Sequence, residues 1–210
     1  MRNNRNWFKH GVALAALVGA LAIPQMASAA AGDFLIHLRG VGVLPDESAT
    51  VTPLGGTVKI NNYYVPEVDV GYFFTDNISA EVIAAVTKHK ARATAAGGIP
   101  LGSVWLLPPT VTVKYHFTPD KMISPYIGAG INYTLFYGTS NPPGLHMHYN
   151  QSVGPAVQFG FDAKLDKHWV FNVDVKKIWM ETDVSINAGA IKAKVNIDPW
   201  LVGAGVGYRF

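Results

Sequence analysis

The chain has 210 residues and no cysteine, which excludes a disulfide framework and a thiolate metal site. Charged residues make up only 15% of the chain, against about 25% in a typical soluble domain. The formal charge of +3 does not indicate a nucleic-acid partner. Three of the 17 basic residues, Arg2, Arg5 and Lys9, lie at the very start, and the rest balance the 14 acidic residues.

The first residues have the features of a secretory signal peptide. A basic start is followed by an apolar run over 11–23, and Ala27 and Ala29 form the small-x-small pattern of a cleavage site. An uncleaved anchor is the weaker alternative, because the apolar run is too short for a membrane helix. We therefore predict a signal peptide over 1–29, cleaved after Ala29 or one or two residues later, and one mature domain over 30–210.

Eight segments of the mature chain alternate between polar and apolar residues with the period of two that is typical of β-strands. The segment 110–117 is the clearest, since every even position is polar and every odd position is apolar. In chain order, the eight predicted strands span residues 34–43, 63–74, 78–89, 110–117, 126–137, 153–165, 169–184 and 198–210.

The connections between these strands alternate between short and long. The short ones span 75–77, 118–124 and 166–167, and the long ones span about 44–62, 90–109, 138–152 and 185–197. An even number of strands with short turns at one end is the layout of an outer-membrane barrel, whose closure leaves no unpaired edge in lipid. We therefore predict an all-β fold, an eight-stranded antiparallel transmembrane β-barrel with long extracellular loops and short periplasmic turns.

Alternation alone does not say which face of each strand lines the interior. The polar face carries few charges and many Gly, Ala and Thr residues, which suits the narrow interior of an eight-stranded barrel better than a solvated exterior. The apolar face is therefore expected to meet lipid. In the last strand this places Tyr208 and Phe210 at the periplasmic aromatic girdle.

Five stretches, "TDNIS", "HKARATA", "LPPTVTVKYHF", "SPYIGAGINYT" and "DPWLVGAGVGYRF", follow one another along the mature chain. They resemble the OmpW family of eight-stranded outer-membrane barrels. The resemblance implies a location in the outer membrane of a Gram-negative bacterium, among its lipid and lipopolysaccharide, and uptake of small hydrophobic molecules through an apolar pocket that is closed toward the periplasm. The terminal aromatic also resembles the signal that the barrel assembly machinery reads, so Tyr208 and Phe210 are expected to act in assembly.

Nine charged residues are expected inside the barrel by alternation, five of them acidic and four basic. Unpaired buried charge is costly, so we expect these side chains to pair with one another and to seal the lumen on the periplasmic side. A charge-selective ion pathway is the alternative. The nine residues are Arg39, Glu67, Asp69, Glu81, Lys114, Asp162, Asp174, Lys176 and Arg209.

The connection 90–109 is unusually apolar for a loop in water. Exposed apolar clusters usually mark a binding site or an interface, although the loop could also fold back and bury its own side chains. Together with the connection 138–152 it is expected to place an apolar pocket over the barrel mouth. The expected lining residues are Leu101, Trp105, Leu106, Leu107, Leu145 and Met147.

Other patterns indicate no chemistry. His146 and His148 are spaced like metal ligands but have no third ligand in view, so no metal site is predicted. The "GAGVG" of 203–207 lacks the helix that follows a dinucleotide-binding loop. No Ser-His-Asp, metalloprotease or nucleophile-elbow pattern occurs, so we predict neither an enzyme nor a cofactor.

The combined prediction is a passive path for small hydrophobic molecules across the outer membrane, with lateral release into the bilayer. Pro66 and Pro155 interrupt strands and cannot donate a ladder hydrogen bond, so either is a candidate seam for release. Pro155 is favoured because the neighbouring Gly154 also removes a side chain. The alternatives are a non-transporting structural, receptor or adhesion barrel and a small-ion channel.

Overall fold

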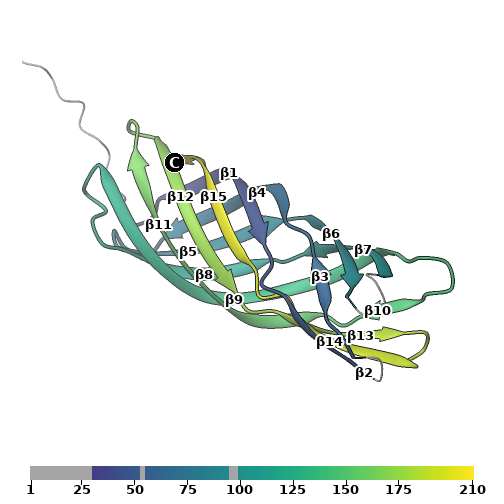
Figure 1. The fold of residues 1–210 in the computed structure, drawn as a ribbon. Helices are drawn as coiled ribbons and strands as arrows, with labels where there is room; N and C mark the ends of the chain where they lie inside the picture. Colours follow the sequence, from purple (N-terminus) through teal and green to yellow (C-terminus); the bar gives the residue numbers. More distant parts are fainter. Residues whose placement is uncertain (1–29, 53–54, 95–98) are drawn as a thin grey trace, which may run out of the picture.

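Figure 1 shows the computed structural model of the chain, which describes residues 30–52, 55–94 and 99–210. The predicted signal peptide over 1–29 lies outside the described residues and stays a prediction. Every regular element of the described residues is a β-strand. These residues contain no helix that is long and apolar enough to cross a membrane.

Eight antiparallel strands close the barrel that the sequence predicts. Strands β1 and β15 pair with each other, and the pairing of β9 with β11 completes the ring. In order around the ring, the strands are β1 (Phe34–Leu44), β4 (Tyr63–Phe73), β5 (Ile78–Ala85), β8 (Thr110–His116), β9 (Ile123–Ser140), β11 (Ser152–Lys164), β12 (Trp169–Ile178) and β15 (Trp200–Arg209).

The predicted long loops consist largely of strands, which extend the barrel at the end opposite the C-terminus (Figure 1). One extension, here called the β7 sheet, contains β3, β6, β7 and the outer end of β9. The other, the β13 sheet, contains β10, β13, β14 and β2. The bounds are β2 (Ser48–Thr52), β3 (Val58–Ile60), β6 (Thr87–Ala93), β7 (Ile99–Leu107), β10 (Met147–Tyr149), β13 (Glu181–Ile186) and β14 (Ile191–Asn196).

Besides β9, whose outer end belongs to the β7 sheet, two of the predicted strands pass from the barrel into an extension. The strand predicted over 78–89 continues from β5 in the barrel into β6 of the β7 sheet. The strand predicted over 169–184 is interrupted, because the amide of Met180 donates a hydrogen bond to the side chain of Asp198 instead of continuing the ladder. Beyond this break the chain belongs to the β13 sheet.

The barrel is apolar outside and polar inside, the reverse of a soluble barrel. Leu38 and Ile131 are 55% and 63% exposed on the outside, whereas the neighbouring Arg39 and Asn132 are buried in the lumen. Only lipid can cover such an exterior favourably. The structure therefore decides the question that alternation left open.

Aromatic side chains gather outside the barrel at the end with the short turns. The ring of Tyr208 lies 4.8 Å from that of Phe210 and 5.2 Å from that of Trp169, and the rings of Phe34 and Tyr72 lie 4.9 Å apart, measured between centroids. Such a girdle marks the level at which a membrane barrel meets the aqueous interface.

Three layers of side chains fill the interior. A small apolar cluster of Leu35, Phe73 and Val170 closes the end with the short turns. A charged layer lies above it, and a large apolar cluster extends from the barrel mouth to the space between the two extension sheets. The candidate site lies in this upper apolar layer.

Candidate ligand site and the charged layer below it

Arg39 on β1 lies at the centre of the charged layer. Its Nε is 3.0 Å from Glu67 Oε1, and its Nη2 is 2.5 Å from Asp69 Oδ2 and 3.6 Å from a carboxylate oxygen of Glu81. Its Nη1 donates to Asn172 Oδ1 at 2.9 Å. One buried guanidinium therefore joins side chains from four strands, β1, β4, β5 and β12.

Two lysines pair with three of the acidic residues. Lys114 pairs with Glu81. The Nζ of Lys176 lies 3.0 Å from Glu67 Oε1 and 2.6 Å from Asp174 Oδ1. These side chains are almost completely buried, so the pairs replace the water that the charges lose.

Besides Asn172, the layer contains His37 and Tyr126, which were not among the nine residues expected there. His37 Nδ1 lies 2.8 Å from Asp69 Oδ1, and its Nε2 lies 3.3 Å from Asp162 Oδ1. The hydroxyl of Tyr126 donates to Asp174 Oδ2 at 2.7 Å. Both residues stand at inward positions of the alternation in their strands, and this signal could have identified them.

Arg209 does not join this network, although the sequence analysis grouped it there. It lies near the end of β15, where its Nε is 3.9 Å from Asp33 Oδ2 and its guanidinium lies over the ring of Phe73. Alternation gives the direction of a side chain but not its height in the barrel. Height depends on how far each strand is staggered against its neighbours.

The histidines and acids offer little to a metal ion. His37, Asp69 and Glu81 form the one group of three potential ligands within 4.8 Å among the described residues, but both carboxylates already pair with basic side chains of the charged layer. His146 and His148 have exposed side chains in and beside β10.

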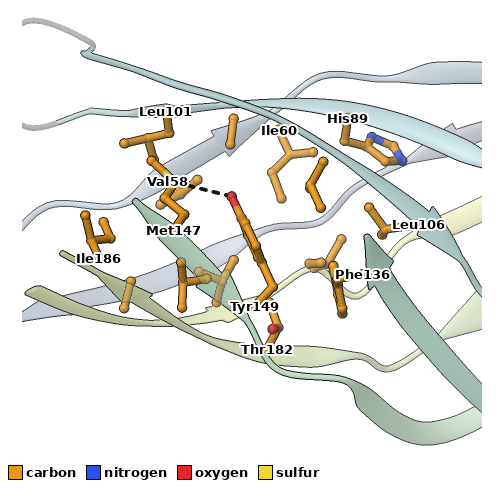
Figure 2. Close-up of a pocket in the computed structure, with 16 residues that line it drawn as sticks. Val58, Ile60, His89, Leu101, Leu106, Phe136, Met147, Tyr149, Thr182 and Ile186 are labelled. Atoms are coloured by element: carbon orange, nitrogen blue, oxygen red, sulfur yellow. Dashed lines mark hydrogen bonds between the residues drawn. The ribbon is translucent and has the colours of Figure 1, made fainter. Parts of the chain in front are cut away.

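An apolar cavity of about 50 Å³, here called the upper cavity, lies between the β7 sheet and the β13 sheet (Figure 2). Inward-facing residues of both sheets line it, and all but three of them are apolar. The lining residues are Val58, Ile60, His89, Ala91, Leu101, Val104, Leu106, Phe136, Met147, Tyr149, Thr182, Val184, Ile186, Ala193, Val195 and Ile197.

The six residues expected to line a pocket fall into three groups. Those that line the upper cavity are Leu101, Leu106 and Met147. Leu145 packs against the apolar cluster around it. Trp105 and Leu107 lie on the opposite face of β7, because Leu106 between them points inward and side chains alternate along a strand.

The three polar side chains of the upper cavity are held by local contacts. Thr182 Oγ1 donates to the Asn150 carbonyl oxygen at 2.7 Å. Tyr149 extends across the cavity, stacks on Phe136 with 5.9 Å between ring centroids, and donates to Met147 Sδ at 3.5 Å (Figure 2). Burial raises the pKa of its phenol. Burial also lowers the pKa of His89 below 6.5, although a hydrogen bond to the Asn61 carbonyl partly offsets the effect. Both side chains are therefore neutral near pH 7.

A second cavity of about 30 Å³, the lower cavity, connects the upper one with the charged layer. It shares His89, Leu106 and Ile197 with the upper cavity, and Glu67 and Lys176 are among its lining residues. The apolar layer therefore ends directly on the ion pairs.

The barrel wall is closed at Pro155, which the sequence analysis favoured as a seam. Strand β11 pairs with β9 continuously from Ser152 to Ala163. The carbonyl of Pro155 accepts a hydrogen bond from the amide of Trp179 at 3.1 Å. A Cβ atom at Gly154 would lie only 1.8 Å from the Trp179 carbonyl oxygen, so no space separates these strands.

The wall beside Pro66 is not closed in this way. Pairing of β4 with β5 ends at Glu67 and Ala85, and no ladder joins residues 63–66 to residues 86–88 in the part of the chain that the structure describes. We call this gap in the ladder the unpaired window. The residues that line the lower cavity at this height include Val65, Ala85 and Thr87.

A closed barrel with a lipid-compatible exterior, an aromatic girdle and a filled polar lumen is an outer-membrane β-barrel protein. A profile of the OmpW family matches residues 30–210. The chain belongs to the OmpW family, as the sequence resemblance indicates.

Relatives with established names support this assignment. An uncharacterized outer-membrane protein of Sinorhizobium fredii, y4mB, is 44% identical over 97% of this chain and 92% of its own length. Outer membrane protein W of Vibrio cholerae is 32% identical over 93% of this chain and 96% of its own. The crystal structure of OprG from Pseudomonas aeruginosa covers 89% of this chain and 99% of its own at 28% identity, with a TM-score of 0.82. The chain is thus a protein of the Gram-negative outer membrane and lies in membrane lipid.

Proposed function

We propose that this barrel is a passive, non-catalytic path for small apolar molecules across the outer membrane. The upper cavity is the observation that carries the proposal. It has an apolar lining on the extracellular side of the molecule, and its few polar groups are neutral. Such a lining favours apolar solutes, whose transfer out of water is favourable.

The size of the cavities indicates how a solute enters. Ligand pockets usually measure about 300–1,000 Å³, whereas the two cavities measure about 50 and 30 Å³. A solute must therefore separate the two extension sheets. Their edge strands β2 and β3 belong to different sheets, so separation at this edge breaks no ladder hydrogen bond.

Release is proposed to be lateral, through the unpaired window. The charged layer blocks the downward route, because an apolar solute passing it would leave buried charges without partners. The same close pairing argues against the ion-channel alternative. The window lies beside the lower cavity, and opening the wall there requires no ladder bond to break.

Delivery to the membrane is proposed to follow the usual route for such barrels. The signal peptide over 1–29 would direct export, and the barrel assembly machinery would recognise Tyr208 and Phe210. Phe210 is 67% exposed on the outside of the folded barrel, so its removal would cost little packing and is expected to affect assembly more than stability.

The test of the proposal is uptake of an alkane-like or terpene-like solute by cells that contain matched amounts of folded protein. Leu106→Asp places a charge where both cavities meet, and uptake should fall at least about tenfold, because the change removes an apolar contact and buries a carboxylate. Ala193→Phe should reduce uptake without adding charge, since it fills the upper cavity.

Thr50→Asp is the matched control, because Thr50 is exposed on β2 of the same extension. It should transport like the parent protein. Uptake that is unchanged in both Leu106→Asp and Ala193→Phe would contradict a route through these cavities.

A further inference from the structure

The outward face of β5 and β6 changes abruptly from apolar to basic. Every even-numbered residue from Ile78 to Val86 is apolar, and every even-numbered residue from Lys88 to Arg92 is basic. Successive outward residues are about 7 Å apart along a strand. The surface therefore passes from a lipid-compatible band to a row of cations within one such step.

Lys59 on β3 joins this row, because it lies opposite Arg92 in the strand register. We call Lys59, Lys88, Lys90 and Arg92 the basic face. Three of the four line a surface groove of about 550 Å³. The other groups in the groove are Ile60, Asn61, Ala91, Pro100, Gly102, Ser103 and Ser140.

Most of this positive charge is unpaired. Lys59 lies 3.3 Å from Glu47, but among the described residues no acidic side chain pairs with Lys88, Lys90 or Arg92. A concentration of one sign of charge indicates an anionic partner.

The outer face of the β13 sheet has a different charge balance, although its lysines are also exposed. There Lys192 and Lys194 share the face with two acidic residues of the neighbouring strand. Lys194 lies opposite Asp183 in the register, and its Nζ lies 3.2 Å from Glu181 Oε1. An excess of positive charge is thus a property of the basic face, whereas two acidic residues balance the two lysines of the β13 sheet.

The height of the basic face relative to the membrane follows from aromatic residues. Lys88 Nζ lies 5.1 Å from the centre of the Trp105 ring, and Trp105 lies opposite Tyr137 in the register. Tryptophan and tyrosine gather at the membrane interface. The basic face therefore begins at the extracellular interface, at the level of the outer-leaflet head groups.

We propose that the basic face binds the lipid A phosphates of lipopolysaccharide. Arg92 offers a planar fork that matches phosphate oxygens, and the lysines supply further charge-assisted hydrogen bonds. The site lies on the opposite face of the β7 sheet from the upper cavity. It is therefore separate from the proposed conduit and would attach that sheet to the membrane surface.

The test compares two double variants of the folded barrel in non-ionic detergent, each immobilised and titrated with lipopolysaccharide. K90Q/R92Q should weaken binding about tenfold or more, since each surface cation adds to attraction for anionic lipid. Added salt should weaken binding to the parent protein. K192Q/K194Q is the matched control, with two exposed cations removed from the balanced face, and it should bind like the parent.

Four results would overturn the proposal. Equal binding by K90Q/R92Q and the parent would exclude the basic face, and equal weakening in both double variants would indicate a general charge effect. Binding of dephosphorylated lipopolysaccharide as strong as that of the intact form would show attachment by acyl chains alone. Phosphatidylglycerol vesicles serve as a competitor. If they displaced lipopolysaccharide as effectively as free lipopolysaccharide does, the basic face would bind any anionic lipid surface and would not recognise lipid A.

Discussion

A buried guanidinium in contact with three carboxylates tolerates little change in its surroundings. Arg39 contacts Glu67, Asp69 and Glu81, which it shares with Lys176, His37 and Lys114, in a lumen from which water is largely excluded. Removal of one partner from such a set leaves buried charge uncompensated, and this costs far more than the loss of an exposed ion pair. The charged layer thus acts as one unit and not as a sum of separate pairs.

Arg39→Met should lower the free energy of unfolding by about 3–5 kcal/mol. The measurement is urea unfolding of the detergent-refolded barrel. Arg209→Met is the comparison, because Arg209 has a single acidic partner at 3.9 Å and lies outside the network. A smaller loss is expected there, and a larger loss for Arg209→Met than for Arg39→Met would contradict the central place of Arg39.

At the scale of strands, a tryptophan is expected to reduce uptake when it is introduced beside the unpaired window but not when it is introduced beside the closed wall at Pro155. Ala85→Trp places a large side chain on the lower cavity beside the window, and uptake of an apolar solute should fall several-fold. Val153→Trp adds the same side chain on the lipid-facing side of β11, next to Pro155, and uptake should not change. If Val153→Trp reduced uptake and Ala85→Trp did not, the exit would lie beside Pro155 and not at the unpaired window.

The sequence was sufficient to predict the strands whose two faces differ strongly in polarity. The segment 110–117 has one polar and one apolar face, and β8 follows it closely. Alternation alone does not identify a change of partner strand. The pattern is lost over 176–180, where two lysines precede three apolar residues, but this loss does not say which strands pair on either side of it. The break there depends on Asp198, which is distant in sequence.

The candidate site was predictable only in part, for a related physical reason. Treating 90–109 as an irregular loop gave Trp105 and Leu107 the same direction as Leu106. Recognition of a strand would have separated them by alternation. The contribution of β13 and β14 to the cavity could not be predicted, because it arises from long-range packing between two sheets.

For the whole molecule, the position of the extensions defines which end meets the outside of the cell. A cysteine in place of the exposed His146, beside β10, should react with an impermeant thiol reagent on intact cells. A cysteine in place of the exposed Lys167, in the short turn between β11 and β12, should react only after the outer membrane is opened. If only Lys167→Cys were labelled in intact cells, the short turns and not the extensions would face the outside of the cell.

The small volume of the upper cavity also determines how tightly any solute can bind. A solute that fits only a separated arrangement of the two sheets binds with an apparent affinity reduced by the fraction of molecules in that arrangement. If about 1% of the molecules are separated at any time, the apparent dissociation constant rises about 100-fold. Part of the free energy gained by desolvating the solute then offsets the free energy needed to separate the sheets. Closure of the sheets favours release of the solute. For the proposed transport, the resting cavity of about 50 Å³ therefore predicts weak retention and rapid release of the solute.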